Sequence, residues 1–138
     1  SGDLNAQYRS IPDLAHNFVL QAVFEGSPCA REEIEEKLED ARAKRRLSQP
    51  SGASAGCIFK NPEEIPAGKL IDELGLKNAC VGDACVSSVH ANFIINRGHA
   101  RARDITILID MIRKEAMENR GIDLKSEAQV IGDREPQF

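Results

Sequence analysis

The fold is indicated most clearly by residues 92–121, which read NFIINRGHARARDITILIDMIRKEAMENRG. The first five, Asn92–Asn96, are typical of a short strand. Apolar residues then recur at helical spacing from Asp104 to Arg120, and Gly121 follows as a C-terminal cap. The predicted core face of this helix consists of Ile105, Leu108, Ile109, Ile112 and Ala116.

Shorter elements flank this strand and helix. Ala67–Leu74 is predicted to form a short helix that ends at Gly75. Cys80–Ser87 and Glu127–Gly132 have the composition of short strands. This order of strands and helices predicts an α+β fold, with a small antiparallel or mixed sheet and two principal helices.

The N-terminal third of the chain predicts a strand and a helix. Residues 1–17 are rich in turn formers. Asn17–Glu25 has apolar residues on both faces, which predicts a strand buried on both sides. Ser27-Pro28 begins a helix that stops at Gln49-Pro50, with acids early and bases late, as the helix dipole favours.

A polar break at Ser48–Ala55 is the best candidate for a domain boundary. It divides the chain into residues 1–48 and residues 49–138. An irregular loop is expected over residues 50–65.

Composition restricts the classes of protein. The 138 residues carry a net charge of -4 and are 41% hydrophobic, which suits one domain or one domain plus a fragment of another. The acidic balance argues against a general nucleic-acid binder. No apolar run approaches the roughly 18 residues of a membrane span. Because no secretory signal pattern is visible, a cytoplasmic location is expected.

The four cysteines are Cys29, Cys57, Cys80 and Cys85, with no CxxC pair. They are predicted to be free thiols in a reducing compartment. Cys80, Cys85 and His90 recur at intervals of five, but on a continuous strand such residues alternate between faces. Three ligands would also leave a structural zinc site incomplete. No metal site is therefore predicted.

Residues 56–62 read GCIFKNP and hold the densest group of candidate functional side chains. Gly56 lets a substrate approach the backbone beside the Cys57 thiol. Lys60 adds a positive charge, and the Asn61 amide both donates and accepts hydrogen bonds. The stretch suits an anionic substrate held beside a proton donor, with a loop of no chemical role as the alternative.

Other polar residues have both a functional and a structural interpretation. Glu127 would suit proton transfer in a cleft, or would be an ordinary acid at a strand edge. His90 and His99 are structural histidines or bases. Cys57 with a distant histidine would be the minimal layout of a cysteine hydrolase, but no periodic helix begins there to stabilise a thiolate. The chain has no dinucleotide fingerprint and no P-loop.

Several ordered motifs extend over nearly the whole chain: Tyr8-Arg9, Gln49-Pro50, Ser54–Pro62, Ala67–Ile71, His90–Asn96 and Glu127–Gly132. Together they resemble the C-terminal portion of the UDP-N-acetylenolpyruvoylglucosamine reductase (MurB) family. The resemblance implies that residues 1–48 are the tail of an FAD-binding region and that residues 49–138 form the substrate domain.

The resemblance also implies a reaction. In such flavoproteins NADPH reduces FAD, and the flavin passes a hydride to the enolpyruvyl group of the UDP-sugar, which yields UDP-N-acetylmuramate. This oxidoreductase step belongs to peptidoglycan synthesis, and so to cell wall biogenesis, cell shape and the cell cycle. The flavin-cradling glycines of the family have no counterpart here. The chain alone is therefore expected to bind neither FAD nor NADPH and to lack reductase activity.

The family's site residues map onto five positions. Cys57 would donate the proton to the enolate, and Arg9 and Glu127 would stabilise that intermediate. A nearby arginine lowers the barrier by electrostatic preorganisation. Lys60 and Asn61 would help to hold the UDP-sugar.

This chain departs from the family in two side chains that matter. Cys57 stands where serine is usual, and a thiol is the stronger acid, so proton donation survives. Cys85 stands where many members have glutamine, which puts one polar contact in doubt. A non-redox nucleotide-sugar binding module, or a subunit that complements a separate flavin-binding chain, stays open as the alternative. Nucleic acid, membrane and metal are not expected as partners.

Overall fold

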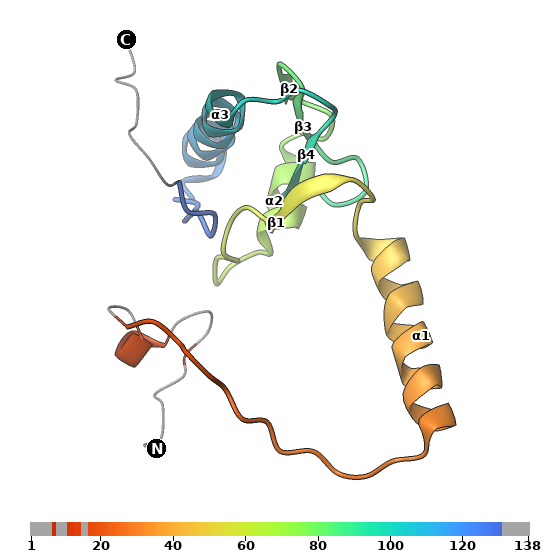
Figure 1. Cartoon of the computed structure of the whole chain (residues 1–138). Coiled ribbons are helices and arrows are strands. Elements are labelled where there is room, and N and C mark those ends of the chain that lie inside the picture. Colours follow the sequence, from red (N-terminus) through yellow and green to blue (C-terminus); the bar gives the residue numbers. More distant parts are fainter. Residues whose placement is uncertain (1–6, 8–10, 15–16, 131–138) are drawn as a thin grey trace. The chain divides into compact units, whose positions relative to one another are not determined.

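The structure, a computed structural model, describes residues 7, 11–14 and 17–130. Figure 1 shows the elements of the chain, which divides into two compact units between residues 35 and 36. The first contains a short 3-10 helix, η1 (Pro12–Leu14), and an extended segment. The second contains a sheet and the helices that pack on it.

A four-stranded antiparallel sheet organises the second unit. Its spatial order is β1-β4-β3-β2, so the first strand pairs with the last. The strands are β1 (Ala53–Cys57), β2 (Cys80–Val81), β3 (Ala84–Val86) and β4 (Phe93–Asn96). With helices α2 (Ala67–Glu73) and α3 (Ala102–Arg120), this confirms the predicted α+β class.

The core lies between this sheet and the two helices. Helix α3 packs against β2 and β3 and also touches α2. The buried side chains of α3 are Leu108, Ile109, Ile112 and Ala116, as the helical spacing predicts, and Ile105 is partly buried beside them. They meet Leu70 and Ile71 of α2 and Ala84, Val86 and Ile94 of the sheet. Each fully buried aliphatic side chain contributes about 1.5–3 kcal/mol relative to exposure.

Both core helices end as their glycines predict. After α2, the Gly75 N–H donates to Asp72 O (2.9 Å) and the Leu76 N–H donates to Ile71 O (3.2 Å). These two bonds form a Schellman motif, which satisfies carbonyl groups at the end of a helix. Helix α3 is capped by Gly121, which has φ 65°. Its start is two residues earlier than predicted, and the Arg101 N–H donates to Asp104 Oδ2 (2.9 Å).

The prediction of one strand over Cys80–Ser87 is wrong, because this stretch folds into a hairpin of two strands. Gly82 and Asp83 make the turn between β2 and β3. Gly82 has φ 54°, and a Cβ atom there would lie 2.8 Å from Asp104 Oδ2 on α3. The turn therefore favours glycine for its backbone angle and for its close approach to α3.

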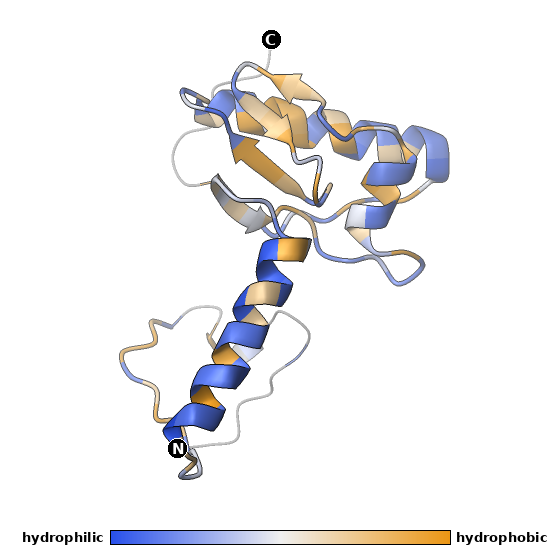
Figure 2. Ribbon diagram, turned by 90° about the vertical axis from the view of Figure 1, so that its right-hand side faces the viewer, coloured by the Kyte–Doolittle hydropathy of each residue, from blue (hydrophilic) through white to orange (hydrophobic). Residues whose placement is uncertain are grey.

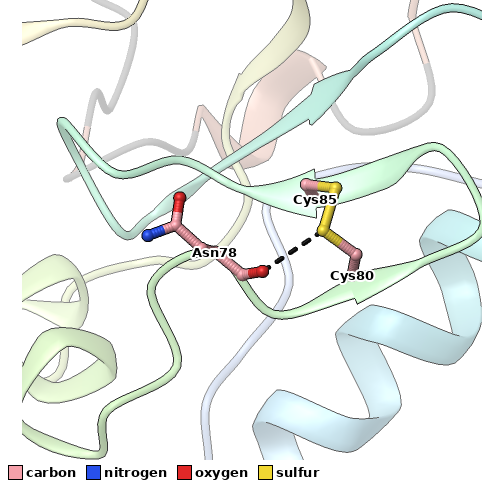
Figure 3. Close-up of a disulfide and its surroundings, with 3 residues drawn as sticks. All are labelled: Asn78, Cys80 and Cys85. Carbon is pink, nitrogen blue, oxygen red and sulfur yellow. Dashed lines mark hydrogen bonds between the residues drawn. A yellow bond between two sulfur atoms is a disulfide. The ribbon is translucent and has the colours of Figure 1, made fainter.

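This hairpin overturns the prediction that all four cysteines are free. It places Cys80 directly opposite Cys85, with Cα atoms 4.1 Å apart, and the two form a disulfide (Figure 3). On a continuous strand the two side chains would point apart, whereas the turn at Gly82-Asp83 brings them together. The carbonyl oxygen of Asn78 lies 3.2 Å from the Cys80 sulfur. Cys29 and Cys57 are free thiols, as predicted.

The predicted strand at Asn17–Glu25 is wrong. Residues 17–30 form no regular secondary structure, and Phe18 and Leu20 are 95% and 96% exposed. A strand that is apolar on both faces needs neighbours on both faces. No described segment pairs with residues 17–25, so the pattern alone does not produce a strand.

Helix α1 (Arg31–Ser48) follows and confirms the predicted helix, although it begins three residues after Pro28. Glu32 and Glu33 lie in its first turn and Arg45 and Arg46 in its last, as the dipole favours. No residue of α1 is buried, and most of it is hydrophilic (Figure 2). Among the described helices, none is long and apolar enough to cross a membrane.

Candidate functional site

Strand β1 positions the free thiol of Cys57. Residues 50–65 were expected to be a loop, but Ala53–Cys57 pairs with β4 as a strand. Ser54 lies opposite Ile95 and Cys57 opposite Phe93, so β1 has one residue more than β4 in this interval. Gly56, with φ 83°, lies within this bulge. Such a bulge redirects the side chain that follows it.

The register decides which face of the sheet carries Cys57. Because Cys57 is opposite Phe93, it belongs to the face opposite that of Ile94, which packs in the core. Its side chain is half-buried and its thiol is free. Cys57 ends a strand and is not the first residue of a helix whose dipole would stabilise a thiolate. This position gives the cysteine-hydrolase interpretation no support.

The backbone beyond Cys57 is fixed by two separate segments. The Ile58 N–H donates to Asn92 O (2.9 Å), and Ile58 O accepts from the Glu127 N–H (2.7 Å). The Lys60 N–H donates to Lys125 O (2.9 Å). Ile58 and Phe59 are both 1% exposed. The residues after the thiol are therefore rigidly placed, which is what a positioned proton donor requires.

Glu127 comes close to Cys57 through this backbone pairing. A single antiparallel bridge joins Phe59 to Ser126, and the Glu127 N–H binds the residue that follows Cys57. Oε2 of the Glu127 side chain is buried. The strand predicted over 127–132 is not formed by residues 127–130, and residues 131 and 132 lie outside the described part.

Lys60 and Asn61 lie at the other end of the same stretch. The Lys60 side chain is half-buried. Oδ1 of Asn61 accepts a hydrogen bond from the Ala67 N–H (3.0 Å), the first residue of α2. Asn61 therefore has a structural role at the start of α2, in addition to the expected contact with a UDP-sugar. Arg9 lies outside the described residues.

His90 has the structural role that was offered as one of its two interpretations. Its Nδ1 accepts from the Asn92 N–H (3.2 Å), and its ring meets Phe93 edge-on at 5.0 Å. A Cβ atom at Gly68 in α2 would lie 2.7 Å from Cε1 of His90. His99 is exposed, and its N–H donates to Asp83 Oδ2 (2.8 Å). His90 thus packs β4 against the start of α2.

Asn92 is a site residue that sequence reasoning missed. Its Oδ1 accepts from the Phe59 N–H (2.9 Å) and its Nδ2 donates to Phe59 O (2.8 Å). It is 2% exposed. The available signal was a polar amide between Ala91 and Phe93, because a buried amide needs fixed partners.

The described residues offer no site for a metal ion or a flavin. In the described ranges no group of three His, Cys, Asp or Glu side chains could hold a metal ion. Residues 31, 67 and 102 begin the described α-helices, and none follows a loop with the repeated glycines that cradle a phosphate. The described residues therefore do not fit a flavin dinucleotide.

Comparison with known proteins gives the chain a family context. Residues 48–131 match the family model for the C-terminal domain of UDP-N-acetylenolpyruvoylglucosamine reductase. Named reductases of this type include those of Syntrophus aciditrophicus, 39% identical over 95% of this chain, and Geotalea uraniireducens, 42% identical over 94%. The chain spans only 42% and 44% of the length of these two relatives.

A solved structure agrees with these matches. The crystal structure of UDP-N-acetylenolpyruvylglucosamine reductase (MurB) from Thermus caldophilus is similar with a TM-score of 0.61 and 42% identity. The similarity covers 72% of this chain and 35% of that one.

Proposed function

Because the chain belongs to the UDP-N-acetylenolpyruvoylglucosamine reductase family, matching its C-terminal domain, we propose that it forms the substrate-binding part of an oxidoreductase of peptidoglycan synthesis. The substrate is the UDP-sugar that carries an enolpyruvyl group, and the product is UDP-N-acetylmuramate. The observation that carries the proposal is the backbone hydrogen bond from the Glu127 N–H to Ile58 O (2.7 Å), the residue that follows Cys57.

The chemistry of Cys57 follows from the reaction. Adding a hydride to one carbon of the enolpyruvyl double bond leaves an enolate, which needs a proton at the neighbouring carbon. Cys57 transfers its S–H proton to that carbon and becomes a thiolate. A positioned acid of this kind contributes about 10²–10⁴-fold to a rate.

The other four proposed site residues interact with the negative charge of the enolate and of the UDP-sugar: Glu127, Arg9, Lys60 and Asn61. Glu127 and Arg9 stabilise the enolate. The Glu127 carboxyl group must be protonated or otherwise neutralised, because a carboxylate would repel the negatively charged enolate. Lys60 and Asn61 hold the anionic UDP-sugar. The half-buried position of Lys60 strengthens its attraction to an anion, because the surroundings are less polar than water.

The complete enzyme would use FAD and NADPH, which supply the hydride. The described residues do not fit a flavin, and the chain spans about two fifths of the relatives' length. We therefore expect the 138-residue chain to bind no flavin and to have no reductase activity by itself. The same two observations favour one second candidate: a nucleotide-sugar binding module, or a subunit that complements a separate flavin-binding chain.

Calorimetric titration of the purified chain with UDP-N-acetylenolpyruvoylglucosamine tests the substrate assignment. Binding is expected, and Lys60→Ala should weaken it, while Lys114→Ala on the exposed surface of α3 is the matched control. A titration with no heat for any variant would remove the binding role of the chain alone. Flavin absorbance in stoichiometric amount on the purified protein would contradict the assignment of flavin to another segment.

A further inference from the structure

Asn92 hydrogen-bonds the backbone directly beyond the point where the pairing of β1 with β4 ends. The last paired residues of β1 and β4 are Cys57 and Phe93, and beyond them the backbone of Phe59 has no strand partner in the sheet. The side chain of Asn92 satisfies both the N–H and the C=O of Phe59, while its backbone carbonyl accepts from Ile58. One residue therefore makes three hydrogen bonds to the two residues that follow the thiol.

Only an amide of this length can make both side-chain bonds. Asp would present a second acceptor to the carbonyl of Phe59, and Ala would leave a buried peptide group without partners. Gln would carry one methylene more, in a position that is 2% exposed. The chemistry of the position is therefore specific to Asn, beyond filling space in the core.

We propose that Asn92 is the positioning residue of Cys57: its amide holds the Ile58–Phe59 backbone so that the thiol is kept half-buried at the end of β1. The role of that thiol as a proton donor rests on the proposed function. The positioning itself does not, because it is a statement about the backbone and about the accessibility of Cys57.

Asn92 directly precedes β4, and the last residue of β4 offers a matched control. Oδ1 of Asn96, at the other end of β4, accepts from the N–H groups of Gly98 (2.8 Å) and Ala100 (3.0 Å). Asn96 therefore also ties backbone to the sheet through its amide, but at the opposite end of the strand from Cys57. A general loss of stability should follow from changing either residue, whereas an effect on Cys57 should follow from changing Asn92 alone.

The test is the rate at which iodoacetamide alkylates Cys57, measured without reductant across a range of pH. Cys29→Ser is included in every protein, because Cys29 is the other free thiol. Loss of one of the two hydrogen bonds between the Asn92 side chain and Phe59 should increase local opening of the backbone after Cys57 about fivefold. Loss of both should increase it about twentyfold. Asn92→Ala should therefore accelerate alkylation at each pH. Two controls should keep the alkylation rate within about twofold of that of the Cys29→Ser protein in buffer. One is Asn96→Ala, and the other is the Cys29→Ser protein itself in enough urea to lower its stability to that of Asn92→Ala.

A second variant keeps the test decisive if Asn92→Ala does not fold. Asn92→Asp keeps the acceptor for the Phe59 N–H but turns a carboxylate oxygen toward the Phe59 carbonyl, so it should also accelerate alkylation. Alkylation at the rate of the Cys29→Ser protein in a folded Asn92 variant would overturn the proposal, as would an equal acceleration in Asn96→Ala. If Asn92 controls alkylation but the UDP-sugar protects Cys57 in no variant, the positioning role stands and the proposed function fails.

Discussion

Residues 17–48 and residues 53–128 use similar apolar side chains with opposite results. Phe18 and Leu20 are 95% and 96% exposed, whereas Phe59 and Leu70 are 1% and 0% exposed. In the second region β1 pairs with β4 at one side of the sheet, and the helices cover one face of this sheet. The first contains an extended segment and a helix with no buried residue. An apolar pattern therefore makes burial possible, but a partner element has to be present.

The largest expected effect comes from exchanging one leucine in each region. Leu70→Ala should lower the free energy of unfolding of the second unit by about 2–5 kcal/mol, since it leaves a cavity in the core. Leu20→Ala should change it by less than about 0.5 kcal/mol. Urea unfolding followed by circular dichroism measures both. A loss of similar size in the two variants would break the comparison.

Reduction of the Cys80–Cys85 disulfide should have the next largest effect, on the second unit. A loop this short contributes about 2 kcal/mol when it is cross-linked. Urea unfolding with and without dithiothreitol measures the difference. The double variant Cys80→Ala/Cys85→Ala is the control and should not respond to reductant. If the wild-type protein is equally stable under both conditions, the disulfide does not contribute to this unit.

The smallest effect concerns Asp123, which follows α3 on the way to Glu127. Its hydrogen bond from Lys125, helped by Arg113, lowers the pKa of this carboxyl below its ordinary value of 3.8. A lowered pKa in the folded protein adds stability above the ordinary pKa, and this stability is lost as pH falls through the lowered value. Asp123→Asn should therefore be slightly less stable at pH 7.

Unfolding curves of both proteins from pH 7 to about pH 2 check this prediction. The small difference at pH 7 should shrink on acidification, because the ion pairs at Asp123 are exposed and disappear when the carboxyl is protonated. A gap that widens in acid would show that the sign is wrong.

Local patterns predicted the elements whose causes are local. Helices α2 and α3 and strand β4 follow from apolar spacing and from the glycines at 75 and 121. The hairpin at residues 80–86 was missed because Gly82-Asp83 interrupts a short apolar run that also reads as one strand. The disulfide depends on that turn and was missed with it.

Contacts between residues far apart in the sequence could not be predicted from the spacing of apolar residues. The pairing of Ile58 with Glu127 joins residues far apart in the chain, and only the resemblance to a family placed Cys57 and Glu127 in one site. Asn92 was visible as a polar residue in an apolar run, but its partner Phe59 lies 33 residues away. The strand predicted over residues 17–25 failed for the related reason that no described segment pairs with it.

The most direct measurement is product formation by a fusion of this chain to the part of the Thermus caldophilus reductase that this chain does not cover. The substrate is UDP-N-acetylenolpyruvoylglucosamine, and the product is UDP-N-acetylmuramate, measured with NADPH in excess. Cys57→Ala should slow product formation by about 10²–10⁴-fold, and Cys57→Ser should retain most of it. Product formation at the unsubstituted rate in Cys57→Ala would contradict the assignment of Cys57 as the proton donor.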